Sequence, residues 1–214
     1  MDVFEAMHSL RSMRRLKPDP VPDELIHKIL DAAIRAPNGQ NTQPWSFMVV
    51  RDEAKRQFFK DQYLHHMMRI FGDRIPEPDD TSSTARTIRA AVYLAEHMHE
   101  VPVLLVVCGK RDWPFRVPPE ERKGLAPPSY GSVYPAIQNI LLACRALKLG
   151  ACLTTLHQCF ELEWCETLGI PDEYGIVSVI PVGWPKGKFG PVTRSPVEEV
   201  CFADQWGKPY APDL

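Results

Sequence analysis

The feature that most constrains the fold is a run without a single polar side chain in the middle of the chain, residues 101–108, Val-Pro-Val-Leu-Leu-Val-Val-Cys. A strand that exposes one face to water alternates apolar and polar side chains, whereas a strand with two apolar faces has to be covered on both. The run therefore predicts a central strand with a layer of structure on each side. Two further strands are predicted over residues 45–51 and 175–182.

Helical periodicity surrounds these strands. Apolar residues recur every three or four positions over residues 22–35, 53–71, 84–99 and 130–149, and a shorter helix is predicted over 159–168. The longest apolar face belongs to 130–149, which we expect to be a core or dimer-interface helix. With 214 residues, of which 44% are apolar, the chain is predicted to form one domain, a mixed α+β sandwich with a central sheet flanked by helices.

Composition excludes some classes of function. A formal net charge of −2 argues against a nucleic-acid surface or a polybasic membrane surface, because both are strongly basic. No apolar stretch approaches the roughly 18 residues of a membrane span, and Asp2, Glu5 and His8 interrupt any signal-like start. We therefore expect a cytoplasmic protein. The six cysteines form no Cys-x-x-Cys pair, and His157 with Cys159 is a weak metal signal, so reduced thiols and no metal site are expected.

The first fifty residues carry a basic cluster. Residues 11–15, Arg-Ser-Met-Arg-Arg, follow an apolar helix start, and their guanidinium and hydroxyl groups suit a phosphate held by charge-assisted hydrogen bonds. By itself such a cluster is more typical of a solvated helix end. Arg15 in particular is predicted to be either a further phosphate contact or merely exposed.

An amide-rich loop follows at residues 36–45, Ala-Pro-Asn-Gly-Gln-Asn-Thr-Gln-Pro-Trp. Its Asn and Gln side chains are hydrogen-bond donors and acceptors, and its glycine allows the backbone to approach a planar ligand closely. Alone, such a sequence is usually just a turn. Because a helix would hold this loop at a fixed separation from the basic cluster, the two together favour binding of a phosphorylated aromatic cofactor.

These two motifs, at this spacing and followed by a strand, resemble the N-terminal half of the nitroreductase family of flavin enzymes, which has the pattern R-x-S-x-R, helix, A-P-S-x-x-N-x-Q-P-W, strand. The residues at its fixed positions are Ser12, Arg14, Ala36, Pro37, Asn41, Gln43, Pro44 and Trp45, and Arg11 adds a guanidinium group at the variable position just before Ser12. Two positions depart from the pattern. Leu10 stands where members often have Arg, and Asn38 replaces Ser but keeps a small hydrogen-bonding side chain.

Later segments also resemble this family. Residues 136–150 match its A-I-Q-N helix and, with Lys148 in place of the first glycine, the L-G-L-G that follows. Residues 194–196 match the R-x-P that begins its R-x-P-x-x-x-x-[VI] motif near the C-terminus. Thr154-Thr155, followed by Pro-Val-Gly-Trp-Pro at 181–185, is most similar to the branch that includes iodotyrosine deiodinases. The resemblance covers nearly the whole chain and is weakest over residues 61–128.

The resemblance implies a nitroreductase-like three-layer sandwich, with a central, mainly antiparallel sheet flanked by helices, that assembles as an intertwined homodimer. Residues 1–214 would form a single FMN-binding domain, with residues 197–214 as a C-terminal arm that wraps the partner subunit. The loop at 72–84 is predicted to be either a substrate lid or a plain surface excursion. Tyr130, Ser132 and Tyr134 are expected either to line a substrate pocket or to pack in the core or the dimer interface.

The resemblance also implies roles toward FMN. Arg11 and Arg194 would bind the phosphate. Arg14 would stabilise the negative charge that reduction leaves on the ring, and Ser12 would contact the ribityl chain or the pyrimidine edge. The amide-rich loop would contact the isoalloxazine ring from the same or the neighbouring subunit, and the Thr-Thr pair would lie near its N5 edge. The predicted cofactor-binding set is Arg11, Ser12, Met13, Arg14, Pro37, Asn38, Gly39, Asn41, Leu153, Thr154, Thr155 and Arg194. No catalytic side chain and no metal ligand is predicted.

The implied function is that of an FMN-dependent NAD(P)H oxidoreductase, in which NAD(P)H and then a nitroaromatic, quinone or other flat acceptor use one pocket in a ping-pong cycle. The sequence argues against a Rossmann domain, because no G-x-G-x-x-G motif follows a predicted strand. Four alternatives stay open: a reductive dehalogenase of halogenated phenols, an oxygen-dependent flavin-fragmenting enzyme, a flavin-binding storage or regulatory protein without turnover, and an unliganded structural dimer.

Overall fold

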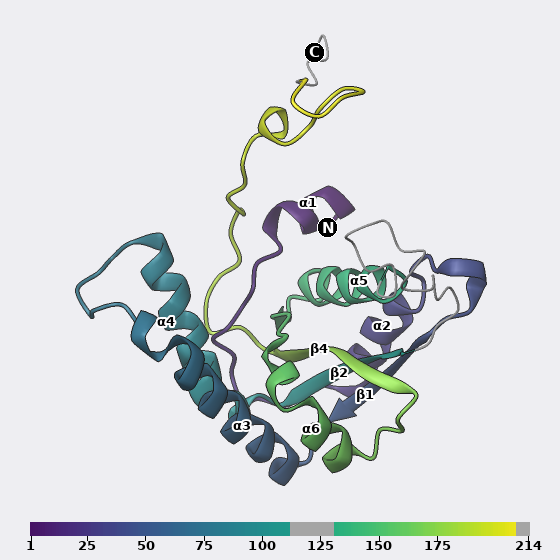
Figure 1. The fold of residues 1–214 in the computed structure, drawn as a ribbon, viewed down its shortest axis with the longest axis vertical. Helices are drawn as coiled ribbons and strands as arrows, with labels where there is room; N and C mark the ends of the chain where they lie inside the picture. Colours follow the sequence, from purple (N-terminus) through teal and green to yellow (C-terminus); the bar gives the residue numbers. More distant parts are fainter. Residues whose placement is uncertain (112–130, 209–214) are drawn as a thin grey trace, which may run out of the picture.

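A computed structural model describes residues 1–111 and 131–208 of the chain. At the centre of the described part lies a four-stranded antiparallel sheet in the order β1-β2-β4-β3 (Figure 1). Its strands are β1 (Trp45–Val50), β2 (Val103–Lys110), β3 (Gly150–Ala151) and β4 (Tyr174–Gly183). The three predicted strands are confirmed. β3 was not predicted, because two residues are too few to show a period.

Helices cover both faces of the sheet. α2 (Asp23–Ala33) and α5 (Val133–Ala146) lie on one face, and α3 (Glu53–Phe71), α4 (Ser83–Glu96) and α6 (Glu161–Leu168) lie on the other (Figure 1). The side chains of β2 alternate between the two cores, with Val103, Leu105 and Val107 in the first and Leu104, Val106 and Cys108 in the second. The predicted α+β sandwich, with a central strand covered on both faces, is therefore confirmed.

Local signals account for the bounds of several helices. The Asp52 carboxylate and the Ser82 hydroxyl each accept a hydrogen bond from the amide three residues on, at 2.9 and 3.1 Å, and so begin α3 and α4. α6 ends at Gly169, whose φ of +68° favours glycine. α4 is shorter than the predicted helix 84–99, because a separate 3-10 turn, Met98–Glu100, follows it. No helix in the described ranges is both long and apolar enough to cross a membrane.

The first helix, α1 (Val3–Ser9), buries little of its apolar surface. Ala6 is its buried residue, whereas Phe4 is 68% exposed and Met7 is 45% exposed. α1 packs beside α5, at a distance from the sheet (Figure 1). The apolar stripe that predicted this helix start is thus left without a covering surface in the described part of the chain.

The C-terminal segment leaves the body of the molecule. After β4 the chain runs back past α1 and continues into an arm that projects away from the layers (Figure 1). Val197 and Val200 are exposed there, and Trp206 is 88% exposed. Several large apolar side chains exposed on one segment are characteristic of an interaction surface.

The loop at 72–84 begins with a 3-10 turn, Gly72–Arg74, and is tied to the helix that follows it. The guanidinium of Arg89 in α4 donates to the carbonyls of Glu77 and Asp80, at 3.2 and 2.5 Å. These bonds hold the loop against α4 in the conformation described. Its role as a substrate lid stays a prediction.

One buried histidine makes stability depend on pH. His157 is fully buried below the sheet, and its Nε2 donates to the carbonyl of Ile176 at 2.9 Å, while Nδ1 has no partner within the described ranges. Burial lowers the pKa of this imidazole from its ordinary value of about 6.5. As the pH falls below about 6.5, this imidazole binds a proton in the unfolded chain but stays neutral in the folded chain. The contribution of His157 to the free energy of unfolding is therefore present above this pH and is lost below about 6.5.

We expect His157→Gln, which keeps a donor but does not titrate, to lose less free energy of unfolding than the parent between pH 7 and pH 5. Urea unfolding at the two pH values measures this. His27→Gln, at an exposed position of α2, is the control and should follow the parent. Equal losses in His157→Gln and the parent would contradict the assignment.

Candidate functional site

The basic cluster lies on an extended segment that follows α1. The amide of Met13 donates to the carbonyl of Ala151 in β3 at 2.9 Å, and the amide of Lys186 donates to the carbonyl of Arg15, also at 2.9 Å. The segment is therefore held between β3 and the residues that follow β4. The sheet edge, rather than a helix, fixes the positions of its arginines.

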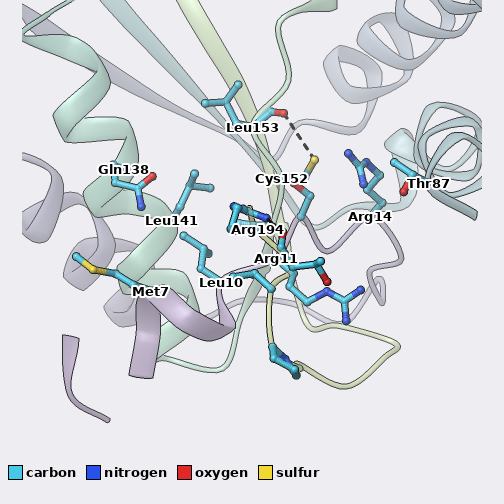
Figure 2. Close-up of a pocket in the computed structure, with 15 residues that line it drawn as sticks. Met7, Leu10, Arg11, Arg14, Thr87, Gln138, Leu141, Cys152, Leu153 and Arg194 are labelled. Atoms are coloured by element: carbon cyan, nitrogen blue, oxygen red, sulfur yellow. Dashed lines mark hydrogen bonds between the residues drawn. The ribbon is translucent and has the colours of Figure 1, made fainter. Parts of the chain in front are cut away.

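A cavity of about 560 Å³ opens beside this segment (Figure 2). Its walls come from the end of α1, the basic cluster, one residue of α4, α5, the chain just after Gly150, and the C-terminal segment. The lining residues are Met7, Leu10, Arg11, Ser12, Arg14, Thr87, Gln138, Leu141, Ala151, Cys152, Leu153, Pro191, Val192, Thr193 and Arg194. The N- and C-terminal regions of the chain thus meet at one site.

Three positive charges surround the cavity, and no carboxylate of the described residues neutralises them. Within the described residues, no carboxylate oxygen lies within 4 Å of a guanidinium nitrogen of Arg11, Arg14 or Arg194. Figure 2 shows all three arginines around the same opening, with Arg14 beside Thr87 of α4. Like charges around one opening repel one another, and a bound anion offsets that repulsion. The arrangement favours a ligand that carries at least one phosphate or carboxylate.

Part of the cavity wall is apolar and neutral. Leu10, Leu141 and Leu153 line it together with the thiol of Cys152. Burial raises the pKa of that thiol, against smaller lowering effects of Arg14 and Ser12, so the thiol stays protonated at neutral pH. No thiolate charge therefore competes with an anionic ligand for the arginines.

Beneath Cys152 lies a second neutral group. Tyr63 of α3 is buried, and its burial raises the pKa of the phenol to about 12. Its hydroxyl lies beside that of Thr154, which in turn donates to the carbonyl of Val179 at 2.6 Å. Tyr63 lies in the same core cluster as Cys152, on the α3 side of the sheet.

The structure brings together five of the predicted cofactor-binding residues. Arg11, Ser12, Arg14, Leu153 and Arg194 all line the cavity. They come from three separate parts of the sequence, so their convergence follows from the fold and not from their spacing.

Three predicted residues lie close to the cavity without lining it. The side chain of Met13 packs into the core on the α3 face. The hydroxyl of Thr154 is turned into the sheet, toward Val179. Thr155 is exposed, and its side chain makes no hydrogen bond within the described part of the chain. Whether these residues contact a cofactor stays a prediction.

The predicted loop residues Pro37, Asn38, Gly39 and Asn41 do not line the cavity of their own chain. The carboxamide oxygen of Asn38 accepts from the amide of Gln43 at 2.8 Å, which closes the loop on itself.

Positive backbone φ angles mark the same loop. Gln40, Asn41 and Gln43 have φ values of 51°, 53° and 48°, in the left-handed region that side-chain-bearing residues seldom adopt. The amide of Gly39 donates to the hydroxyl of the buried Ser132 at 3.2 Å, which anchors the loop to the start of α5. Strain of this kind persists only when surrounding contacts impose it, and it is concentrated at functional sites.

Arg15 is exposed and lies outside the cavity wall, yet it makes a contact that was not predicted. Its guanidinium carbon lies 4.5 Å from the ring centroid of Tyr93 in α4, and Lys186 donates to the Tyr93 hydroxyl at 2.7 Å. Arg15 thereby links the basic segment to α4. Sequence spacing cannot reveal such a contact, because the two residues are nearly eighty positions apart.

Some lining residues were not predicted. Gln138 belongs to the A-I-Q-N segment, so the motif itself contained the signal for it. Thr87 falls where the resemblance is weakest, and no pattern marks it. Of the aromatic candidates near α5, Tyr134 is exposed and Tyr130 lies outside the described residues. Among the described residues, no group of three or more His, Cys, Asp or Glu is arranged to hold a metal ion.

Comparison with known proteins identifies the family. A model of the nitroreductase family matches residues 9–184. The chain belongs to the nitroreductase family. An NADH dehydrogenase of Thermus thermophilus is 28% identical, over 94% of this chain and 96% of its own length. A protein of Methanothermobacter thermautotrophicus, provisionally named an NADH dehydrogenase/NAD(P)H nitroreductase, is 31% identical over 86% of this chain and 78% of its own. The predicted family is confirmed, and its homologues are NAD(P)H oxidoreductases.

Solved structures agree on the fold. A BluB-like flavoprotein from Clostridium difficile 630 has a TM-score of 0.73 at 24% identity, covering 96% of this chain and 100% of that one. Iodotyrosine deiodinase bound to FMN and 3-iodo-L-tyrosine has a TM-score of 0.70 at 22% identity, covering 95% and 99%. The nitroreductase-like fold predicted from the motifs is therefore confirmed.

The cavity of this nitroreductase-family chain has the features that a phosphorylated flavin requires. Its wall contains arginines that have no carboxylate partner in the described part of the chain, and it also contains apolar side chains. Its volume lies within the usual range of about 300–1,000 Å³ for ligand sites. The residues present thus fit FMN, the cofactor implied by the motifs.

We expect Gly150→Ala to disturb the basic segment. A Cβ at this position would stand 2.6 Å from Cδ2 of Leu16 and 3.0 Å from Cβ of Met13, so the segment would have to shift. Overpacking of this kind costs about 1–3 kcal/mol of unfolding free energy. Chemical denaturation measures it, with Gly72→Ala at the end of α3 as control, since its nearest atom, Cε of Met68, is 4.0 Å away. Equal stability of the two variants would contradict this prediction.

Proposed function

We propose that this nitroreductase-family chain is an FMN-dependent NAD(P)H oxidoreductase that reduces nitroaromatic, quinone or similar flat acceptors. The observation that carries the proposal is the set of three arginines around one cavity that no carboxylate of residues 1–111 or 131–208 neutralises, in a chain whose homologues are NAD(P)H oxidoreductases. A dianionic phosphate on an apolar ring system matches both the charge and the wall of that cavity.

The phosphate is assigned to Arg11 and Arg194. They approach from different segments, so two planar guanidinium groups can each donate to phosphate oxygens. Ser12, next to Arg11, offers a hydroxyl to the same phosphate or to the ribityl chain.

The ring is assigned to the space between Arg14 and the apolar wall. Arg14 is half-buried, so its charge acts in a region of reduced dielectric, where it stabilises an electron-rich ring most effectively. Leu153 would pack against the ring. Because the hydroxyl of Thr154 already donates to Val179, we assign Thr155 as the side chain that can donate to the ring edge.

A second copy of the chain is proposed to complete the site. The loop with Asn38, Gly39 and Asn41 is pre-formed and lies outside the wall of its own cavity, so it would contact a flavin held by a partner subunit. The apolar face of α1 that the described residues leave uncovered also supports an intertwined homodimer. So do the exposed side chains of Val197, Val200 and Trp206, and the arm 197–214 would then wrap the partner.

Bound FMN would supply the redox chemistry, taking a hydride from NAD(P)H and returning electrons to the acceptor. The chain's own part is to bind, orient and stabilise charge. Arg14 counters the charge that develops on the ring, and solvent supplies protons, so no side chain is assigned as nucleophile or general acid.

The absorption spectrum of the purified protein, followed by identification of the flavin released on denaturation, tests the cofactor. Oxidation of NADH and NADPH in the presence of nitroaromatics, quinones and halogenated phenols then tests the reaction. Released FMN with turnover of a nitroaromatic or quinone is the expected result. Turnover of the halogenated phenol alone would favour the dehalogenase alternative, and a protein that stays colourless after FMN is added would refute the proposal.

Replacing Arg194 with Ala is expected to weaken FMN binding. Loss of a hydrogen bond between charged groups costs about 1.5–3 kcal/mol, which raises the Kd by about 10- to 150-fold. Fluorescence titration measures this, and riboflavin, which lacks the phosphate, should bind the variant as it binds the parent. Lys188→Ala, in the same segment but outside the cavity wall, is the matched control. A variant that holds FMN as tightly as the parent rules out this role.

Replacing Arg14 with Gln is expected to make the reduction potential of the bound flavin more negative. Removal of a charge-assisted contact of about 1.5–3 kcal/mol to the reduced ring corresponds to roughly 30–65 mV for a two-electron couple. Redox titration in the visible region measures the potential. Arg15→Gln, whose parent residue lies over Tyr93 and outside the cavity wall, should leave it unchanged. An unchanged potential in Arg14→Gln would count against the assignment.

A further inference from the structure

Arg145 does not line the cavity, yet it holds segments that do. It lies in the last turn of α5, and its Nε donates to the hydroxyl of Ser9 at 2.9 Å. That hydroxyl in turn donates to the carbonyl of Glu5 at 2.6 Å, so its orientation is fixed. Ser9 ends α1 and stands two positions before Arg11. Arg145 therefore sets the point at which the basic segment leaves α1.

The same guanidinium also holds the C-terminal segment. Its carbon lies 4.3 Å from the ring centroid of Phe189, in the geometry of a cation–π contact. Three residues later, the amide of Val192 donates to the carbonyl of His8 at 2.9 Å. The segment that leads to the cavity is thus attached both to α5 and to the end of α1.

Arg11 completes this junction. One of its guanidinium nitrogens lies 3.5 Å from the position that a Cβ would take on Gly190, between the two attachment points. Arg194 follows four residues further on. The two arginines assigned to the phosphate therefore belong to segments that Arg145 holds together, although it is not itself part of the cavity wall.

We propose that Arg145 is a positioning residue that sets the separation of Arg11 and Arg194, and thereby the affinity for ligands that carry a phosphate. The inference rests on the proposed function, because it assumes that these two arginines bind the phosphate of FMN. Two guanidinium groups can serve one phosphate only at a narrow range of separations, and small displacements of binding groups have large costs.

The charge of Arg145 is a competing explanation. Within the described residues it forms no ion pair with a carboxylate, so its charge adds to the positive potential near the cavity. A lysine keeps that charge, but it cannot combine a planar stack on Phe189 with a directed hydrogen bond to Ser9. The two explanations therefore predict different behaviour for Arg145→Lys.

The test compares FMN with riboflavin, which differs only by the phosphate. Dissociation constants of both flavins are measured by fluorescence titration for the full-length parent, Arg145→Met and Arg145→Lys. We expect the Kd for FMN to rise about tenfold or more in both variants. The Kd for riboflavin should change far less, because the ring site does not depend on the separation of the two arginines.

A matched control is available on the other face of the sheet. Arg56 also connects segments, since its guanidinium donates to the carbonyl of Val101 at 2.9 Å and to that of His99, but it does not line the cavity. Arg56→Met should lower the thermal stability and leave the FMN-to-riboflavin affinity ratio at the parent value. A second test is the double variant of Arg145→Met with Arg194→Ala, whose loss of FMN affinity should be smaller than the product of the single losses.

The outcomes separate this inference from the proposed function. A parent that binds neither flavin overturns both. If the parent binds FMN, two results would overturn this inference alone. One is an Arg145→Met variant that binds FMN as tightly as the parent. The other is an equal fall in the affinities for FMN and riboflavin, which would indicate a general structural defect. Parent-like FMN affinity in Arg145→Lys would likewise overturn it, because charge would then suffice. Selective loss of FMN affinity in both variants supports it.

Discussion

Three guanidinium charges without carboxylate partners in the described part of the chain are the constraint on which this site depends. Arg11 and Arg14 come from the beginning of the chain and Arg194 from its end. Mutual repulsion of like charges would drive these segments apart unless other contacts held them. The structure supplies those contacts through the backbone and through Arg145. The charge thereby becomes available to a ligand, and it accounts for a cavity that favours an anionic one.

The edge of the sheet explains how the two ends of the chain meet. β3 pairs with the end of β4, and the basic segment bonds to Ala151 of β3. The residues that follow β4 pair with the same segment, so three distant stretches lie side by side at this edge. Gly150 stands where they approach most closely, which leaves no room for a side chain. The cavity is therefore a property of the sheet edge and not of any one motif.

The success of sequence-based prediction differs from element to element for physical reasons. The strand at 101–108 could be predicted because both of its faces are apolar, and a strand with two apolar faces has to lie in the centre of a sheet that is covered on both sides. Arg11, Ser12, Arg14, Leu153 and Arg194 could be proposed from motif position, and they line one cavity. The direction of the Thr154 hydroxyl could not be predicted, because a two-residue polar pair has the same sequence whichever face of the sheet it meets. Long-range contacts could not be predicted either. The contact of Arg15 with Tyr93, and those of Arg145 with Ser9 and Phe189, join residues that become neighbours only through the fold.

The sequence by itself determined the layered α+β architecture, the family and the residue types that converge on the site. These follow from side-chain periodicity and from short motifs, which are local properties. Only the tertiary structure decided which predicted residues share a cavity, which hydroxyls are already engaged, and which apolar surfaces are left uncovered. Those outcomes depend on how distant segments pack against one another, because the partner that buries a side chain or accepts its hydrogen bond belongs to a different segment of the chain.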